Sequence, residues 1–179
     1  MNEEEIAKLA EKVSKGKPIN IFIRIAGSVS ALAGLLAMFL PFGKIMYYHP
    51  ESVSLSQASK YGTTAILLLF AIVLGLVASL GNLYSMILVG KKKTTKAILL
   101  SIIGVVFGLI ALILCTMYAE QFLWEIEYDC RMRVDRGIAY YASYICIFIS
   151  LALNITSAII VSLIHSGKTT VEKMFHGKS

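Results

Sequence analysis

The chain has 179 residues, of which 57% are hydrophobic and 16% charged, and its formal net charge is +6. Four apolar stretches, residues 19–42, 63–89, 97–119 and 138–164, hold 24, 27, 23 and 27 residues. About 20 apolar residues cross a bilayer as a helix, whereas a soluble domain could not cover four such helices with the polar residues that remain. The composition therefore excludes a soluble globular protein and predicts an all-α membrane protein with a bundle of four transmembrane helices.

The first 18 residues precede the first predicted span and are mostly polar. Asn2 can cap a helix, Glu5 stands three residues later as in a capping box, and Ile6 and Leu9 lie on one apolar stripe. We expect residues 1–18 to form an amphipathic helix along the inner leaflet, or else a frayed polar tail. The first apolar stretch is too long for a cleavable signal peptide, so it is expected to remain as a span.

Basic residues are unevenly divided between the two sides of the predicted membrane domain. The side of the N-terminus carries twelve: Lys8, Lys12, Lys15, Lys17, Arg24, Lys91, Lys92, Lys93, Lys96, Lys168, Lys173 and Lys178. The opposite side carries Lys44, Lys60, Arg131, Arg133 and Arg136. Because basic loops stay in the cytoplasm, both termini, including the tail 165–179, are predicted to be cytoplasmic in the cell membrane, with outer loops 43–62 and 120–137.

The enrichment of basic residues on the predicted cytoplasmic side accounts for the net positive charge, so a nucleic-acid partner is not needed to explain it. The lysine-rich turn at residues 90–96 has no groove-reading element or base-stacking platform beside it. We expect contact with the lipid bilayer and no nucleic-acid partner.

Small residues mark the faces through which the spans are expected to pack, because lipid removes the hydrophobic reason for helices to associate. Two glycines four residues apart lie in the third span, and small or polar residues recur at steps of three and four along the fourth. The candidate helix-packing residues are Gly104, Gly108, Ser143, Cys146, Ser150 and Asn154. A packing seam inside one bundle is the structural interpretation, and a homodimer face or the wall of a polar pathway are the functional ones.

The second outer loop has the most regular short-range pattern, because apolar and charged residues alternate from Trp124 to Asp135. Such alternation predicts a strand, for which residues 44–48 and 53–56, around a turn at 49–52, are expected partners in a small extracellular sheet. The competing interpretation continues the third helix to about Tyr128. The candidate partner-binding residues in this loop are Trp124, Glu125, Glu127, Asp129, Arg131 and Arg133.

Patterns that would indicate catalysis or metal binding are missing from the sequence. The three cysteines stand 15 and 16 residues apart without a Cys-x-x-Cys pair, and the three histidines have no ligand spacing. None of the eleven acids lies within a predicted span, which weighs against proton-coupled transport. We expect no enzymatic activity, no cofactor and no metal.

Four segments carry a family resemblance: residues 40–42 at the end of the first span, the serine-rich 53–62, the lysine turn 90–96, and 137–141 at the start of the fourth span. Together they resemble a large, mostly uncharacterised group of four-span membrane proteins of Gram-positive bacteria, over about residues 19–164. Some members carry a zinc ribbon ahead of the first span, and this chain does not. The architecture is also similar to the claudin plan, although the paired cysteines of the claudin first loop are missing.

The resemblance implies a four-span architecture and assigns no functional residue. The sequence favours a non-enzymatic integral membrane protein that binds a protein partner, or another copy of itself, through its outer loops and small-residue helix faces. A small transporter or channel subunit is the alternative.

Overall fold

Four helices long and apolar enough to cross a membrane make up most of the molecule. The computed structural model describes residues 18–46, 51–55, 62–90 and 93–165. The helices are α2 (Pro18–Phe39), α3 (Gly62–Gly90), α4 (Thr94–Cys130) and α5 (Ile138–His165). The four predicted helices are confirmed, and the predicted N-terminal helix and C-terminal tail lie outside the described residues.

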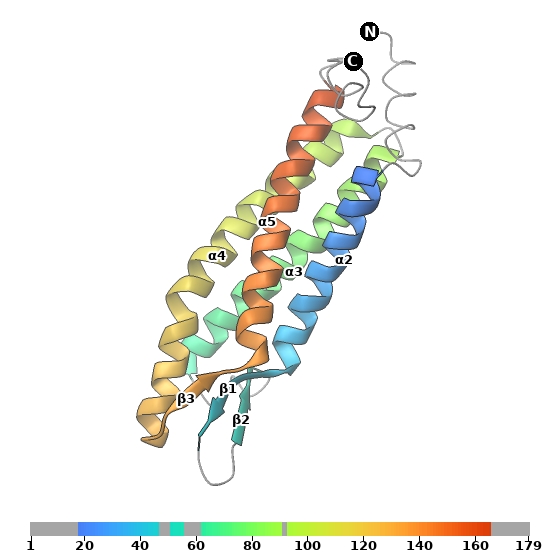
Figure 1. Ribbon diagram of the computed structural model, residues 1–179. Helices are drawn as coiled ribbons and strands as arrows, with labels where there is room; N and C mark the ends of the chain where they lie inside the picture. Colours follow the sequence, from blue (N-terminus) through green and yellow to red (C-terminus); the bar gives the residue numbers. More distant parts are fainter. Residues whose placement is uncertain (1–17, 47–50, 56–61, 91–92, 166–179) are drawn as a thin grey trace, which may run out of the picture.

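The helices run side by side as one bundle, and α5 packs against each of the other three (Figure 1). The starts of α2 and α4 and the ends of α3 and α5 lie at one end of the bundle (Figure 1). A small sheet and the last turns of α4 lie at the other end, which we call the sheet end. The elements that flank the lysine turn are therefore at the end opposite the sheet.

The interior of the bundle contains many small residues beside larger ones such as Leu68 and Ile147, and large apolar residues cover its surface. Ala71, Ala111, Ser30 and Ser150 are fully buried. Large exposed apolar side chains lie on all four helices: Phe22, Leu32, Leu35, Ile66, Phe70, Leu80, Leu99, Val106, Ile113, Ile145, Phe148 and Ile159. Exposure of so much apolar surface to water is unfavourable, whereas contact with lipid tails is not. In lipid the helices are then held together by close packing of their small residues.

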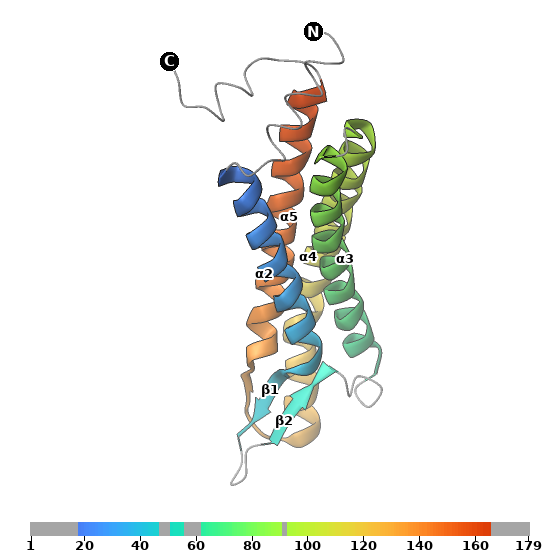
Figure 2. The ribbon, with the colours of Figure 1, turned by 90° about the vertical axis from the view of Figure 1, so that its right-hand side faces the viewer.

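The sheet has the strand order β2-β1-β3, with both pairs antiparallel. Its strands are β1 (Pro41–Ile45), β2 (Glu51–Ser54) and β3 (Val134–Arg136). Figure 2 shows β1 and β2 below the end of α2. Phe42 of β1 and Val53 of β2 are buried against the helix ends. The predicted small sheet is present, but β1 begins three residues earlier than expected and Glu51 and Ser52 of the predicted turn belong to β2.

The strand predicted from Trp124 to Asp135 is wrong for most of its length, because α4 continues to Cys130. The competing interpretation, a longer third helix, is the correct one. No glycine or proline interrupts the sequence between Gly108 and Cys130, so neither residue type ends the helix before Cys130. The buried side chains of Ala119, the last residue of the predicted span, and of Phe122, Leu123 and Ile126 beyond it recur at helical spacing. They belong to the core cluster that also contains the sheet residues Phe42 and Val53.

Candidate functional site

A groove lies at the sheet end between the last turns of α4 and β3. Its volume is about 500 Å³, and it is lined by Glu120, Leu123, Trp124, Glu127, Arg133, Val134, Asp135 and Arg136. Residues 120, 123, 124 and 127 share one helical face, because steps of three and four residues return to the same side of an α-helix. The continuation of α4 as a helix therefore creates one wall of the groove.

The other wall is fixed by backbone hydrogen bonds of the sheet. Arg136, Asp135 and Val134 pair with Gly43, Lys44 and Ile45 of β1. Flanking bonds run from the Met46 N–H to the Arg133 carbonyl at 3.0 Å and from the Gly137 N–H to the Phe42 carbonyl at 2.8 Å. Arg131, in the left-handed conformation with φ 52°, ends α4 and turns the chain toward β3.

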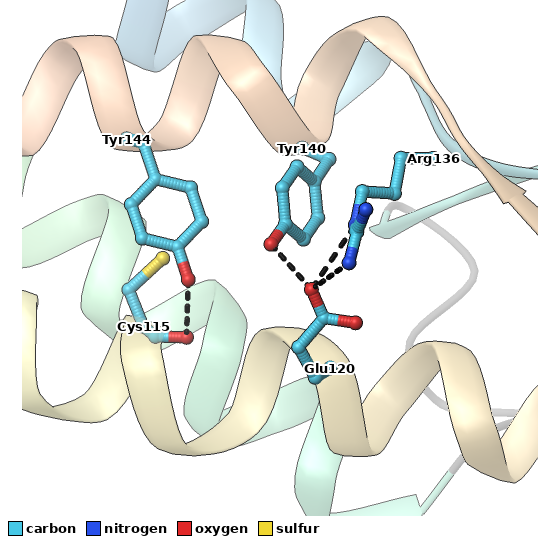
Figure 3. Close-up of polar contacts among 5 residues, drawn as sticks. All are labelled: Cys115, Glu120, Arg136, Tyr140 and Tyr144. Atoms are coloured by element: carbon cyan, nitrogen blue, oxygen red, sulfur yellow. Dashed lines mark hydrogen bonds and ion pairs between the residues drawn. The ribbon is translucent and has the colours of Figure 1, made fainter.

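Glu120 joins the two walls (Figure 3). Its Oε1 accepts hydrogen bonds from Arg136 Nη2 at 2.7 Å, Arg136 Nε at 3.0 Å and Tyr140 Oη at 2.6 Å. The Arg136 guanidinium also lies 5.3 Å from the centre of the Tyr140 ring. One turn further into the bundle, Tyr144 Oη donates to the Cys115 carbonyl at 3.5 Å. These contacts connect α4 to β3 and to the start of α5.

The carboxyl of Glu120 titrates below its ordinary range. The hydrogen bond from Tyr140 lowers the pKa of Glu120 most, Arg136 lowers it further, and partial burial opposes both. The pKa of Arg136 is raised by its hydrogen bonds to Glu120 and by the charge of that carboxylate. The two directions agree, and both describe an ion pair whose side chains are about half exposed, 51% and 52%.

The structure divides the six candidate partner-binding residues. Trp124, Glu127 and Arg133 line the groove. Glu125 faces away from it, because its Oε1 accepts bonds from Thr64 Oγ1 of α3 at 2.7 Å and from Gln121 Nε2 at 3.1 Å. The remaining two, Asp129 and Arg131, are exposed and do not line the groove. Glu125 thus has a structural partner that the sequence did not indicate.

Sequence reasoning missed Glu120, Asp135, Arg136 and Tyr140 as parts of the site. Arg133 Nε pairs with Asp135 Oδ1 at 3.2 Å, two residues away on the same chain segment. Glu120 and Arg136 are sixteen residues apart, and they meet only because α4 extends past the predicted span and the chain then reverses. Helical continuation was the signal that could have found them.

The candidate helix-packing residues of α4 and α5 lie against different neighbouring helices. Ser143 Oγ lies 3.8 Å from Cys115 Sγ of α4, and the side of Gly108 faces Leu151 of α5. Ser150 Oγ donates to the Ile147 carbonyl of its own helix at 3.3 Å. Cys146 meets α2 and α3, because Ser30 Oγ donates to its carbonyl at 2.8 Å and lies 2.7 Å from Ser79 Oγ.

Asn154 occupies a notch made by Gly104. Its Nδ2 donates to the carbonyls of Ala78 at 3.0 Å and Ser150 at 2.8 Å. A Cβ at Gly104 would fall on its Oδ1, which accepts no hydrogen bond from the described residues. The amide oxygen therefore packs directly on the glycine backbone, where a weak Cα–H···O contact is available.

A second buried asparagine side chain joins α3 to α5 in a similar way. Asn82 Nδ2 donates to Ser157 Oγ at 2.7 Å and to the Leu153 carbonyl at 3.1 Å, and its Oδ1 likewise accepts no hydrogen bond from the described residues.

Within the described part of the chain, no group of three or more histidine, cysteine or acidic residues could hold a metal ion.

The fold and the residue distribution define a class: a four-helix bundle whose helices can each cross a membrane, capped by a three-stranded sheet. Comparison with protein families, with curated proteins and with solved structures finds no match.

Proposed function

We propose that this chain is a non-enzymatic integral membrane protein of the cell membrane that binds a protein partner, or a second copy of itself, at its sheet end. In this proposal α2 to α5 span the bilayer, both termini are cytoplasmic and the sheet end is extracytoplasmic. The twelve basic residues on the side of the N-terminus, against five on the other, support this orientation.

One observation carries the proposal: the groove at the sheet end is open and polar, while most polar groups inside the bundle, apart from the amide oxygens of Asn82 and Asn154, form hydrogen bonds within the bundle. The groove is lined by charged residues and by Trp124, whose side chain is 62% exposed. Tryptophan and arginine are the residues that most often dominate the binding energy of protein interfaces. A rigid wall of helix and sheet keeps them in place without a partner, which lowers the entropy lost on binding.

Orientation is tested with single cysteines in a Cys130→Ser background and a membrane-impermeant maleimide. Glu51→Cys at the sheet end should be labelled in intact cells, and the exposed Thr95→Cys at the start of α4 only after lysis. Labelling of Thr95→Cys in intact cells would reverse the proposed topology.

Binding is tested with a photo-crosslinking amino acid, benzoylphenylalanine, placed at Tyr128, which is 71% exposed beside the groove. The matched control is Tyr84, an exposed tyrosine of α3. Irradiation of native membranes should give a discrete protein adduct from position 128 and none of the same mass from position 84. Two differently tagged copies in one cell distinguish a homodimer from a different partner. Absence of any protein adduct from position 128 contradicts the proposal.

A transporter or channel subunit is the second candidate, and the unpartnered amide oxygens of Asn82 and Asn154 inside the bundle favour it. Replacement of Asn82, Ser150 and Asn154 by leucine should then abolish flux in reconstituted vesicles and leave crosslinking from position 128 intact. Loss of crosslinking with unchanged flux would exclude this second candidate.

A further inference from the structure

Of the five charged side chains that line the groove, four form two ion pairs and one is not in an ion pair with a described residue. Glu120 pairs with Arg136 at 2.7 Å and Arg133 pairs with Asp135 at 3.2 Å. Glu127 also lines the groove, and it makes no hydrogen bond or ion pair with any described residue. The groove therefore contains two internal pairs and one carboxylate whose charge is unmatched.

The position of Glu127 in its helix makes this imbalance larger. It lies in the last turn of α4, together with Asp129, and that turn contains no basic residue. The carbonyl end of a helix carries a partial negative charge, so each acid there is unfavourable by about 0.3 to 1 kcal/mol. Arg131 follows directly but forms no ion pair with either acid among the described residues. Among the described residues, no ion pair compensates the negative charge at the end of α4, a local conflict expected where a ligand supplies the missing charge.

Trp124 stands one helical turn before Glu127 on the same face of α4. Its indole stacks on the ring of Tyr128, with centroids 5.5 Å apart and an interplanar angle of 24°, and it remains 62% exposed. An exposed indole face beside a carboxylate is the arrangement that attracts ammonium and guanidinium groups, through the ring quadrupole and the opposite charge together.

The height of the site above the membrane separates a protein ligand from a lipid headgroup. Glu127 lies eight residues past Ala119, the end of the predicted span, which is about 12 Å along the helix axis. Headgroups occupy about 5 to 8 Å on each side of the hydrocarbon core. With the edge of the hydrocarbon core at Ala119, where the predicted span ends, the carboxylate projects beyond the headgroups, into the space that a protein outside the membrane can reach.

We propose that the groove binds a lysine or arginine side chain from a basic segment of an extracytoplasmic protein, with Glu127 as its counter-charge and Trp124 as its platform. The Glu120–Arg136 pair joins the two walls, the Arg133–Asp135 pair lies within one of them, and with both pairs formed the groove has one unmatched charge and binds one cation. This inference rests on the proposed function, because it names the chemistry that the docking partner presents.

Trp124 is the only tryptophan in the chain, so its intrinsic fluorescence reports on the groove directly. The full-length protein in phosphatidylcholine nanodiscs is titrated with amidated hexa-arginine and, for comparison, with hexa-glutamate. Hexa-arginine should change the emission saturably, and hexa-glutamate should not. Glu127→Gln should weaken hexa-arginine binding by about tenfold. Asp129→Asn, which removes the same charge two residues away and outside the groove, should change it less than twofold.

Fluorescein-labelled hexa-arginine extends the test to variants without tryptophan. Trp124→Leu should weaken binding, and Trp124→Phe should retain part of it. Equal effects of Glu127→Gln and Asp129→Asn would reduce the attraction to diffuse charge and overturn the inference, as would wild-type affinity in Trp124→Leu.

Crosslinking from position 128 distinguishes a failure of the cation site from a failure of the docking surface. If the adduct forms in native membranes with the same yield in Glu127→Gln as in the wild type, the cation site is wrong and the docking surface stands. If no adduct forms in either protein, both proposals fail. Loss of the adduct in Glu127→Gln, with an unchanged yield in Asp129→Asn, supports both.

Discussion

Ser30, Ser79 and Asn154, in the middle of the bundle, are fully buried and bond to neighbouring helices, whereas Trp124 and Glu127, at the end of α4, face an open groove. Both regions are polar, but the interior uses small uncharged groups and the sheet end uses charged and aromatic ones. Inside a lipid bilayer no water is available as a hydrogen-bond partner, so polar groups there are expected to bond to one another, as all but the amide oxygens of Asn82 and Asn154 do among the buried side chains described. In the proposed topology the sheet end is in contact with water, so charged side chains such as Glu127 can be solvated without a partner in the described part of the chain.

This contrast separates the residues that hold the fold from those that could serve function. Interior substitutions should change stability, and groove substitutions should change binding with little effect on stability. The largest expected effect lies where the two regions meet, at Phe42.

Phe42 is fully buried at the junction of sheet and helices, edge-to-face with Phe122 and Tyr140 at centroid distances of 5.6 Å. Phe42→Ala should lower the free energy of unfolding by about 3 to 5 kcal/mol, because it leaves a cavity under the sheet. Phe39→Ala is the matched control, since Phe39 is 71% exposed on α2 and its loss should stay within about 0.5 kcal/mol. Equal destabilisation in detergent would contradict the described packing of the sheet.

Gly104→Ala tests the interior in the same way. The new methyl group would displace the Asn154 amide from its bonds to Ala78 and Ser150, with an expected loss of about 1 to 3 kcal/mol. Gly81→Ala is the control, because its nearest neighbour, Leu100 Cδ1, would be 3.9 Å away. An alanine there should stabilise the helix by about 0.5 to 1 kcal/mol.

The opposite signs of the two glycine variants are the decisive result. If both raise the melting temperature, the amide does not occupy the Gly104 notch. In a double-mutant cycle, Asn154→Ala should cost less stability in the Gly104→Ala background than in the wild type, since the two residues are in contact.

The sequence already contained most of this interior. Length and apolarity predicted the four helices. The small and polar residues that recur at steps of three and four along the fourth span are all fully buried: Ala139, Ser143, Cys146, Ser150, Asn154 and Ser157. It did not reveal that Asn154 pairs with Gly104, because helical spacing defines a face but not the neighbour opposite that face. Rotation and relative height of two helices are set by the whole bundle.

The sheet end was harder to predict, because one segment satisfied two periodicities. From Trp124 onward the residues alternate, yet Ala119, Phe122, Leu123 and Ile126 also follow the helical repeat. α4 is already helical before Trp124, and adding residues to an existing helix costs little free energy, because the unfavourable step of helix formation is nucleation. Propagation of the helix therefore outweighed the strand preference of the alternating pattern. Glu120 and Arg136 meet only if α4 continues, so their ion pair could not be predicted from the sequence.

Ser30→Ala should have a smaller effect than the glycine variant. Ser30 Oγ contacts Ser79 Oγ at 2.7 Å and the Cys146 carbonyl at 2.8 Å, and such hydrogen bonds between membrane helices contribute about 0.6 kcal/mol on average. Ser28→Ala, on the exposed side of the same helix, should leave stability unchanged. Identical melting temperatures for the two variants would mean that the bond across α2, α3 and α5 contributes nothing.

The smallest expected effect concerns Glu120 and pH. Because its pKa is lower in the folded protein, the Glu120 carboxylate adds stability above the ordinary glutamate pKa of about 4.3, and that stability is lost as pH falls through the lowered pKa. Half exposure screens the pair with Arg136, so the contribution should be only a few tenths of a kcal/mol. Glu120→Gln should remove this part of the acid-side slope of stability against pH. A slope that is the same in Glu120→Gln and in the wild type would mean that Arg136 and Tyr140 do not hold the two walls of the groove through this carboxylate.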